Sequence, residues 1–404
     1  MKLCIQNINV RDKQVILRVD YNVPFSDGVI LDDSKIRASI KTIRYLLKEN
    51  CKIILLSHFG KIRNNYDKQV YSLSIVAERL KQILNHEVYF SKVNFGDDVI
   101  KRVQVMQPGE ILMLENTRFM DLPNKLESKC DAQLAMFWAS LGDVFVNDAF
   151  ATMHRRHAST YGIAMYLPSC IGFLVQEEVN ALDKYIMNPE MPFTLVMGGA
   201  KMDDKITLIE ALLPKCTHVL CGGGIANTCL KALGFRIGNS IASDNPVIIK
   251  KVQELLLKNK EKFLVPLDAI VGSTYDKDYV QYRRIDKIDD NEIICDIGVK
   301  TLERYSQVIR DSKTVFLNGT VGLYEDMRFA NGTKEILKAL ANSSATVVVG
   351  GGDASSSVHR LGYGDMFTYI SSGGGATLEY LAKGNLVCLD IIQEEGSSIE
   401  ILDM

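Results

Sequence analysis

Short apolar segments alternate along this chain with longer segments whose apolar residues recur at helical spacing. The short segments are typical of buried strands, and most end in glycine or in polar side chains. Amphipathic stretches over residues 41–50, 74–85 and 250–261 predict helices between them. This alternation is the signature of β-α-β units around a parallel sheet, so the pattern predicts an α/β fold throughout.

Four apolar segments in the second half of the chain lead into glycines and then into a helix-like stretch. They are residues 193–197 before 198–199, 219–221 before 222–224, 346–349 before 350–352, and 369–370 before 373–375. Glycine lets the backbone approach a ligand closely, and the helix start behind it offers unpaired N–H groups to an anion. The pattern predicts a nucleotide site at the carboxyl ends of these strands.

Four segments of the first half end instead in cationic and amide side chains. They are residues 18–22, 55–60, 112–118 and 144–148, and a basic run over residues 154–157 follows the last of them. Cations and amides at the ends of strands suit a small anionic substrate. The two halves therefore share an architecture and differ in the chemistry of their turns.

The region 166–192 separates the cation-rich half from the glycine-rich half, and we expect a helix with a proline-marked exit there. The predicted divisions are a first domain over residues 1–170, a connection over 171–191, a second domain over 192–384 and a tail over 385–404. The tail becomes polar and acidic, and we expect its last residues to fray.

Composition narrows the function further. The 404 residues carry a formal net charge of -2, without the basic excess that nucleic-acid binding requires. No apolar segment approaches the roughly 20 residues of a membrane helix, and residues 1–13 lack the apolar core of a signal peptide. The nine cysteines form no C-x-x-C pair, so we expect them to be reduced and mostly buried, with no zinc site. We expect a cytoplasmic protein with neither membrane nor nucleic acid as a partner.

An ordered set of short motifs then points to a family. They are residues 18–24, 57–60, 114–119, 146–150 with 154–155, 198–201 with 204–206, 222–224, 296–298, 318–319 with Gly322 and Glu325, 350–353 and 371–378. With these motifs, in this order and over nearly the whole length, the chain resembles the phosphoglycerate kinases. One glycine run would be a weak signal, whereas the ordered set is highly specific.

The resemblance implies reversible phosphoryl transfer between 1,3-bisphosphoglycerate and ADP, giving 3-phosphoglycerate and Mg-ATP in glycolysis. It implies a monomer with two Rossmann-like three-layer domains, whose parallel sheets face each other across a hinged cleft, and a tail that returns toward the first domain. The first domain would hold the phosphoglycerate, and the second would hold ATP or ADP with Mg²⁺. The acceptor is a carboxylate that is already ionised at neutral pH, so the reaction requires no general base.

In the first domain the resemblance assigns the glycerate and its stable phosphate to one set of side chains. They are Asp20, Asn22, Lys35, His58, Lys61, Arg118 and Arg155. An arginine fork matches phosphate oxygens, and aspartate or asparagine can accept hydrogen bonds from hydroxyls. The alternative is that the arginines form surface ion pairs and that His58 is a packed core histidine.

In the second domain the resemblance places Lys201 at the transferring phosphoryl group and Lys205 at the nucleotide phosphates. Lysines four apart share one face of a helix, and the alternative is a solvated face paired with Asp203 and Asp204. The other nucleotide residues implied are Gly199, Gly223, Gly298, Asn318, Glu325, Gly351, Gly352, Asp353 and Ala354. Gly352 and Gly375 join Lys35 and Lys201 as the catalytic set.

Asp353 has a specific role in the resemblance, as the ligand of Mg²⁺. Magnesium takes one or two carboxylates together with phosphate oxygens and water, so a single aspartate suffices. The competing interpretation is a helix N-cap, and both roles can coexist. Glu325 would accept the ribose hydroxyls, while residues 222–224 with Gly298 would shape the adenine cleft.

The chain departs from the family at several positions. Lys35 and Lys61 stand where the family has arginines, so each keeps the charge and loses the two-pronged donor; Arg37 and Arg63 are the nearby candidates to compensate. Thr320 and Val299 replace prolines, Ala354 replaces serine or threonine, and Tyr369 replaces a histidine that faces the glutamate corresponding to Glu178.

Three functions remain open from the sequence. The first is an active phosphoglycerate kinase, and the second is a divergent, slow or non-catalytic paralogue that binds nucleotide or anion. The third is a nicotinamide oxidoreductase, which lacks support because no G-x-G-x-x-G turn is followed by a ribose-binding acid at the expected distance.

Overall fold

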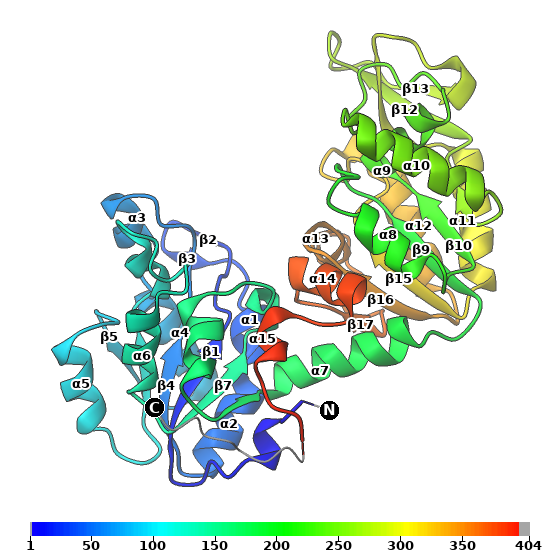
Figure 1. Ribbon diagram of the computed structural model, residues 1–404. Coiled ribbons are helices and arrows are strands. Elements are labelled where there is room, and N and C mark those ends of the chain that lie inside the picture. Colours follow the sequence, from blue (N-terminus) through cyan, green and yellow to red (C-terminus); the bar gives the residue numbers. More distant parts are fainter. Residues whose placement is uncertain (1, 396–404) are drawn as a thin grey trace. The chain divides into compact units, whose positions relative to one another are not determined.

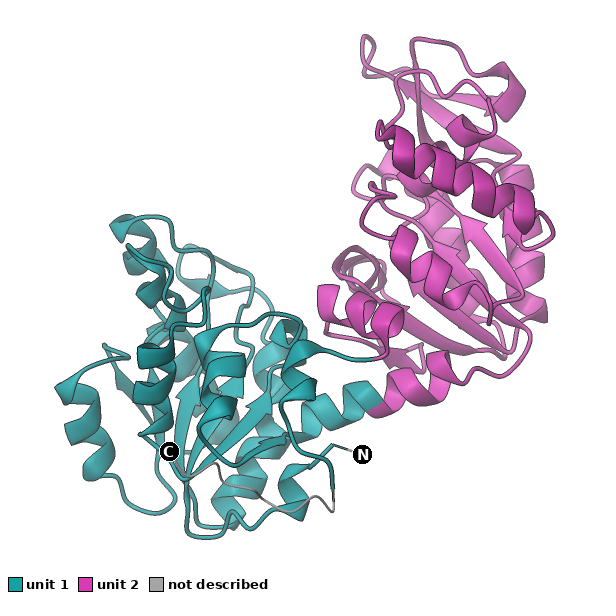
Figure 2. Cartoon of the chain, in the orientation of Figure 1, with its two compact units in different colours: residues 1–179, 385–404 teal, residues 180–384 magenta. Residues whose placement is uncertain are grey.

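The computed structural model describes residues 2–395 of the chain. The chain divides into two compact units, coloured separately in Figure 2. Unit 1 comprises residues 1–179 and 385–404, and unit 2 comprises residues 180–384. Each unit carries its own parallel sheet, so the predicted α/β fold with two sheets is confirmed.

Unit 1 is built on a parallel sheet of six strands in the order β5-β6-β4-β1-β7-β8. Its strands are β1 (Gln14–Val19), β4 (Lys52–Leu56), β5 (Val88–Ser91), β6 (Ile111–Leu114), β7 (Val144–Asp148) and β8 (Ser169–Ile171). Each neighbouring pair is parallel, so all six carboxyl ends lie at one edge. The direction of winding reverses between β1 and β7, which is where such sheets hold their ligands.

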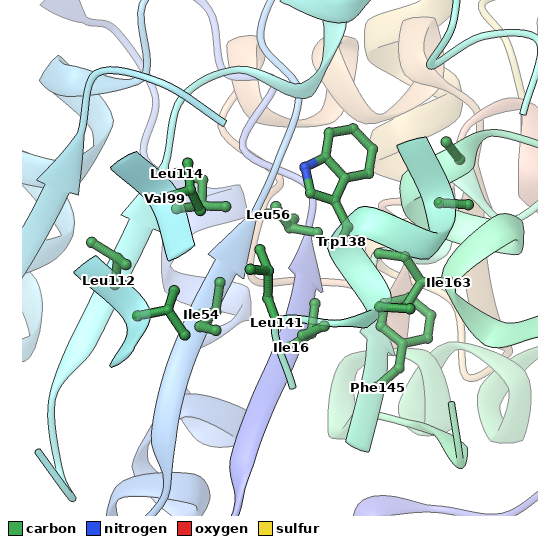
Figure 3. Close-up of a cluster of buried hydrophobic side chains, with 14 of the residues drawn as sticks. Ile16, Ile54, Leu56, Val99, Leu112, Leu114, Trp138, Leu141, Phe145 and Ile163 are labelled. Atoms are coloured by element: carbon green, nitrogen blue, oxygen red, sulfur yellow. The ribbon is translucent and has the colours of Figure 1, made fainter. Parts of the chain in front are cut away.

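Helices cover the sheet of unit 1 (Figure 1), and all of those named next except the helix over residues 65–70 bury apolar residues. They are α1 (Ser34–Ala38), α2 (Ile40–Lys48), α3 (Asn65–Val70), α4 (Ser74–Leu84), α5 (Asp97–Gln104) and α6 (Ala132–Ala139). Figure 3 shows Trp138 of α6 and Val99 of α5 with Ile16, Ile54 and Leu112 of the strands, in one buried cluster. Alternate strand residues point to the opposite face.

Unit 2 contains a second parallel sheet of six strands, in the order β11-β10-β9-β15-β16-β17. Its strands are β9 (Phe193–Met197), β10 (His218–Cys221), β11 (Phe263–Leu264), β15 (Thr314–Asn318), β16 (Thr346–Gly350) and β17 (Tyr369–Ile370). Numbered along the chain this order is 3-2-1-4-5-6, the arrangement of dinucleotide-binding sheets. The winding reverses between β9 and β15, so the residues after these two strands mark the expected ligand site.

Glycine-rich turns connect these strands to helices, as the sequence predicted. The helices of unit 2 are α8 (Ile206–Leu212), α9 (Gly223–Ala232), α10 (Pro246–Lys258), α11 (Val299–Asp311), α12 (Asn331–Ala341), α13 (Gly352–Arg360) and α14 (Gly375–Lys383). Side chains from β15, β16, α11, α12 and α13 form the main core of this unit. The predicted helices over 41–50, 74–85 and 250–261 correspond to α2, α4 and α10.

One part of unit 2 was not predicted. Strands β12 (Asp268–Ser273), β13 (Gln281–Arg284) and β14 (Glu292–Ile297) form a separate antiparallel sheet in the order β13-β12-β14. The expectation of parallel α/β structure throughout was therefore wrong here. A short hairpin in unit 1, β2 (Phe25–Ser26) with β3 (Val29–Ile30), is antiparallel as well.

A helix is present where the sequence predicted the connection between the halves. Helix α7 (Phe173–Leu182) contains the boundary between the units, which falls after Val179. After unit 2, the chain returns to unit 1 and forms the short helix α15 (Val387–Asp390). Two backbone hydrogen bonds tie this segment to unit 1: the Cys388 amide donates to the Met153 carbonyl at 3.0 Å, and the Leu3 amide donates to the Gln393 carbonyl at 2.8 Å. Fraying was expected at the end of the tail, and residues 396–404 lie outside the described residues.

All nine cysteines are free thiols, and all except the half-buried Cys130 are buried, as predicted. Within residues 2–395, no helix has the length and apolar character needed to span a bilayer.

The buried cluster of unit 1 yields a test of the fold. Phe145 is fully buried in the cluster that contains Trp138, the single tryptophan of the chain. We expect Phe145→Ala to lower the free energy of unfolding by about 3–5 kcal/mol, because it removes buried contacts and leaves a cavity. Urea denaturation followed by Trp138 fluorescence measures the change. Val105→Ala, at a side chain 59% exposed, is the control and should change stability by no more than about 0.5 kcal/mol. Equal midpoints for the two variants would contradict this packing.

Candidate functional site

The carboxyl ends of the unit 1 strands surround a cavity of about 440 Å³. We call its lining the cation basin: Asn22, His58, Gly60, Lys61, Arg63, Asp67, Tyr71, Arg118 and Arg155. Asn22 follows β1, His58 to Arg63 follow β4, Arg118 follows β6, and Arg155 follows β7. The basin therefore forms because parallel strands bring loops far apart in sequence to one edge.

Hydrogen bonds from Asp20 and Asn22 tie these loops together. The Asn22 side chain accepts from the Gly60 amide at 2.9 Å, which links the β1 loop to the β4 loop. The Asp20 carboxylate accepts from the Asn22 amide at 3.1 Å and from the Lys35 ammonium at 2.8 Å. The seven first-domain residues predicted from sequence therefore lie together, with Asp20 and Lys35 joined directly to the rim.

Positive charge in the basin exceeds what its neighbours neutralise. Burial, and then the like charge of Arg155, lowers the pKa of Arg118. Arg118 donates to the Gly60 carbonyl at 3.2 Å, whereas its buried Nε has no hydrogen-bond partner. Burial, together with Arg18, Arg118 and Arg155, lowers the pKa of His157 to about 3. A bound anion would relieve this repulsion and satisfy the free donor.

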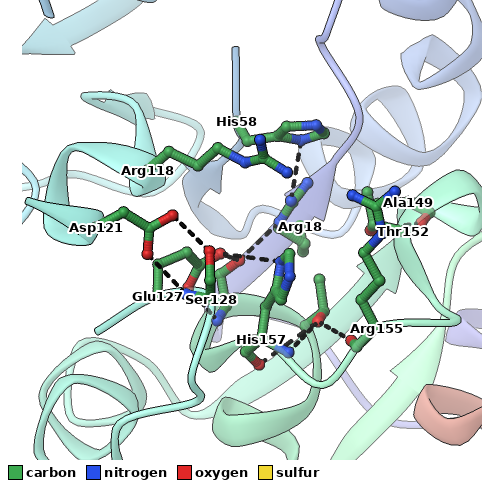
Figure 4. Close-up of polar contacts among 12 residues, drawn as sticks. Arg18, His58, Arg118, Asp121, Glu127, Ser128, Ala149, Thr152, Arg155 and His157 are labelled. Carbon is green, nitrogen blue, oxygen red and sulfur yellow. Dashed lines mark hydrogen bonds and ion pairs between the residues drawn. The ribbon is translucent and has the colours of Figure 1, made fainter. Parts of the chain in front are cut away.

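Under the basin lie buried polar residues that the sequence prediction did not include. Figure 4 shows Arg18 of β1 between His58 and the Glu127 carboxylate. Arg18 and Glu127 are both fully buried, and Ser159 joins them by hydrogen bonds. Burial lowers the pKa of Arg18, and Glu127 opposes that effect. Arg18 is the first residue of the motif over residues 18–24, so the sequence offered a signal for its role. The sequence offered no such signal for Glu127, because it lies in a charged loop.

In unit 2, backbone groups rather than arginines occupy the carboxyl ends of the central strands. The Gly198 amide donates to the Asn318 carbonyl at 2.8 Å, and the Gly199 amide donates to the Thr320 carbonyl at the same distance. Gly199 has φ +96°, and a side chain there would meet the Lys205 ammonium. The Asn318 side-chain amide donates to the Gly350 carbonyl at 2.7 Å. Its side-chain oxygen Oδ1 is buried and has no hydrogen-bond partner. Gly199, Lys205, Asn318 and the turn before α13 therefore form one surface.

Lys205 is the half-buried cation of this surface. Its ammonium contacts the carbonyl oxygens of Gly198, at 2.5 Å, and Asn318, at 3.3 Å. Burial lowers the pKa of Lys205 to about 8, against the opposing effect of Asp353 and Asp204. The prediction that Lys201 and Lys205 share a helix face is wrong, because α8 begins at Ile206, after both lysines. Lys201 is exposed in the preceding turn.

Two helix starts complete the unit 2 surface. Gly351, with φ +95°, is the N-cap of α13, and Gly374, with φ +52°, is the N-cap of α14. Gly352 and Gly375 are therefore the first residues of these helices, where backbone N–H groups lack partners within the helix. The exposed Asp353 follows in the first turn of α13 and is not its N-cap, so that alternative is wrong. Ala354 is fully buried, so it has no exposed side chain to offer a ligand there.

The remaining predicted nucleotide residues lie on neighbouring turns. Gly223, with φ +55°, begins α9, and its amide donates to the Val321 carbonyl at 2.9 Å. Gly298 precedes α11, where a side chain would collide with the Asp268 carboxylate. Glu325 is exposed, and its carbonyl accepts from Arg360 at 3.5 Å.

The structure also explains two of the departures from the family. Val299 is the first residue of α11. Proline is favoured at this position because its backbone suits the start of a helix, so the change from proline to valine affects how the helix begins. Arg37 is paired with Asp33 at 2.7 Å and does not line the basin, whereas Arg63 does. Of the two candidates to compensate for Lys35 and Lys61, only Arg63 is therefore in place.

Comparison with known proteins agrees with this geometry. The family described as "Phosphoglycerate kinase" matches residues 5–384. A phosphoglycerate kinase of Lactobacillus delbrueckii subsp. bulgaricus is 44% identical over 389 residues, covering 94% of this chain and 96% of that protein. A phosphoglycerate kinase of Macrococcus caseolyticus is 43% identical over 397 residues, covering 98% of this chain and 100% of its own length.

Solved structures agree as well. The structure of phosphoglycerate kinase from Coxiella burnetii superimposes with a TM-score of 0.83 at 34% identity, covering 97% of this chain and 98% of the other. That of phosphoglycerate kinase from Pyrococcus horikoshii OT3 gives a TM-score of 0.82 at 31% identity, covering 97% and 99%. With the family match over most of its length and relatives above 40% identity, this chain belongs to the phosphoglycerate kinase family.

Proposed function

We propose that this chain transfers a phosphoryl group reversibly between 1,3-bisphosphoglycerate and ADP, giving 3-phosphoglycerate and Mg-ATP in glycolysis. The family match over residues 5–384 carries this conclusion, and it also removes the nicotinamide oxidoreductase alternative. The cation basin of unit 1 provides an anion site of suitable charge, and the glycine-rich turns of unit 2 provide one for phosphates.

In the basin, Arg118 and Arg155 hold the stable phosphate of the glycerate. Their guanidinium groups carry like charges that repel each other, so a phosphate between them is favoured by both charge and hydrogen bonding. Burial keeps the pKa of His58 well below its usual value, so the ring is neutral and offers one N–H donor. Asn22 and Asp20 contribute oxygen acceptors for the hydroxyl group, and Lys61 adds a further cation at the rim.

Lys35 is the unit 1 cation proposed for the transferring phosphoryl group. Its ammonium is held by Asp20 at 2.8 Å, with the lysine side chain 31% exposed. The Asp20 carboxylate therefore competes with the phosphoryl oxygens for this ammonium. An arginine could keep its contact with Asp20 and still present a second N–H, which lysine provides less well.

In unit 2, the backbone N–H groups at the starts of α13 and α14 hold the nucleotide phosphates. Gly351, Gly352 and Gly375 leave this backbone accessible. Lys205, whose ammonium lies against the Gly198 carbonyl, adds positive charge. We assign the exposed Lys201 to the transferring group, Glu325 to the ribose hydroxyls, and Gly223 with Gly298 to the adenine cleft. Gly199 and Asn318 set the position of Lys205, because its ammonium lies against their turn.

The residues at the start of α13 fit a magnesium ion. Asp353 presents one exposed carboxylate beside phosphate-binding N–H groups, and magnesium needs few protein ligands when phosphates and water supply the rest. Bound Mg²⁺ supplies charge neutralisation for the phosphate oxygens. Asp353 would hold it, and Lys205 adds a fixed positive charge on the same surface.

No general base is required, because the carboxylate of 3-phosphoglycerate is already ionised. The residues act by binding, orienting and neutralising the two ligands. A monomer, a hinge between the units and a cytoplasmic location stay predictions.

The activity itself is tested by a steady-state assay. We expect the purified chain to consume ATP in the presence of 3-phosphoglycerate and Mg²⁺, with the 1,3-bisphosphoglycerate formed coupled to NADH oxidation. Folded protein that binds both ligands but shows no turnover would contradict the proposal and favour the non-catalytic paralogue.

The basin assignment is tested by Arg118→Met. We expect the KM for 3-phosphoglycerate to rise about ten- to a hundredfold, because one or more charge-assisted hydrogen bonds are lost. The KM for ATP should stay unchanged. Arg44→Met, at an exposed arginine of α2, is the matched control and should behave as the unmodified chain. A rise in both KM values, or in neither, would reject the assignment.

The pKa of Lys205 predicts how ATP binding depends on pH. Because the ammonium form attracts phosphates, the affinity should be greatest below the pKa and should fall as the pH rises above about 8. Bound phosphates favour the charged form, so binding should take up protons near this pH. Calorimetry in buffers of different ionisation enthalpy measures both effects. In Lys205→Met only the nucleotide's own titration should remain, and an identical pH profile in both proteins would exclude this role.

A further inference from the structure

A buried polar chain runs from Glu127 to the wall of the cation basin. Glu127 lies in the loop before α6, Ser159 in the helical turn Ala158–Gly162, and Arg18 in the middle of the sheet on β1. All three side chains are fully buried. Buried charges are costly unless they are paired and hydrogen-bonded, so the fold must hold the carboxylate and the guanidinium in a fixed relation.

The hydrogen bonds of this chain have a definite direction. Ser159 donates its amide to the Glu127 carboxylate at 3.0 Å and its hydroxyl to the other carboxylate oxygen. Because the hydroxyl proton of Ser159 is donated to Glu127, the hydroxyl oxygen accepts a hydrogen bond from Arg18 Nε at 3.0 Å. Arg18 then reaches His58 Nδ1 through Nη2 at 3.3 Å (Figure 4).

The last contact fixes the tautomer of His58. A guanidinium has donors only, so His58 Nδ1 must accept, and the ring proton resides on Nε2. Asp20 lies 3.7 Å from the same Nδ1, beyond hydrogen-bond distance. Protonation of Nδ1 would set two donors against each other. Burial lowers the pKa of His58, and the charge of Arg18 lowers it further, against the effect of Asp20. His58 lines the basin, so its Nε2–H is the donor that it can offer to a substrate anion.

We propose that Glu127 is a positioning residue for the kinase reaction: through Ser159 and Arg18 it holds His58 in the Nε2–H tautomer and so sets the affinity of the basin for phosphoglycerate. The inference rests on the proposed function. The proposal adds Glu127, which touches no substrate, lies nine residues after Arg118 in the connection between β6 and α6, and acts through Ser159 and Arg18.

Positioning and simple charge predict opposite effects. If Glu127 acted only through its negative charge, Glu127→Gln would make the basin more positive and tighten anion binding. If it acts by positioning, the substitution weakens the hold on Ser159 and Arg18, and binding of phosphoglycerate weakens. Ser159→Ala removes the link while leaving both charges in place, so it isolates the positioning effect.

The experiment compares Ser159→Ala with Ser169→Ala, a buried serine of the same unit whose hydroxyl donates to the Leu167 carbonyl at 2.7 Å. We expect Ser159→Ala to raise the KM for 3-phosphoglycerate about three- to tenfold, the loss of one hydrogen bond, with the KM for ATP unchanged. Ser169→Ala should leave both constants unchanged. Glu127→Gln should raise the same KM, and it replaces Ser159→Ala if that variant does not fold.

A spectroscopic measurement reads the tautomer directly. The chain has six histidines, so imidazole ¹⁵N spectra of the full-length protein are tractable, with His58 assigned by its loss in His58→Asn. We expect the Nε2–H pattern for His58 in the unmodified chain and a mixture of tautomers in Ser159→Ala. An Nδ1–H pattern in the unmodified chain, or no difference in tautomer and KM between the two serine variants, would overturn the proposal. Equal rises in both KM values would overturn it too, because they indicate general destabilisation.

These readouts separate the two proposals. An unmodified chain without turnover would reject the kinase function, whereas the spectra would still decide whether the buried chain fixes His58.

Discussion

Positive charge gathered at one edge of a parallel sheet is the constraint that shapes unit 1. Burial, and then the like charge of Arg155, lowers the pKa of Arg118, and a third guanidinium, that of Arg18, is fully buried beneath them. Asp121, Glu127 and Asp20 are carboxylates that act on Arg118, and Asp67 lines the basin. Asp20 and Glu127 each accept hydrogen bonds from neighbouring groups. The arrangement is stable because loops and strands hold it, and it is prepared for an anion because the charge is incompletely balanced.

Unit 2 meets a related requirement by different means. Its strand order places the ends of β9 and β15 side by side, and glycines there expose backbone rather than side chains. Lys205 is a half-buried ammonium on that surface, and its hydrogen bonds go to two carbonyl oxygens rather than to a carboxylate. Phosphates can therefore gain a strong partner without breaking an ion pair. Side-chain cations in one unit and backbone N–H groups in the other suit ligands of different size and shape.

Much of this could be predicted from the sequence, because periodicity and turn chemistry are local signals. The apolar run over residues 193–197 coincides with β9, and the polar residues after each strand, such as Asn22 and Arg118, do gather at one edge. The antiparallel strands β12 to β14 were missed although two Asp- and Asn-containing turns flank short β-branched runs, because the parallel pattern of the rest dominated the interpretation.

Other features depend on tertiary structure and had no local signal. Spacing alone placed Lys201 and Lys205 on a helix, but the chain stays in turns until Ile206, which lets Lys205 fold back under the Gly198 carbonyl. Glu127 looks like an ordinary surface charge between Lys125 and Lys129, and only the packing of its loop against Ala158–Gly162 buries it. Sequence reasoning finds ligand-facing residues by their chemistry, whereas supporting residues become visible only through burial.

A crystal structure of this chain with 3-phosphoglycerate would test directly whether the cation basin holds the phosphate. We expect the phosphate to lie in the cation basin, with its oxygens in hydrogen-bond contact with the guanidinium groups of Arg118 and Arg155. Occupancy instead at the larger groove of about 660 Å³ beside β3, α1 and α4, with the basin arginines left without ligand, would contradict it.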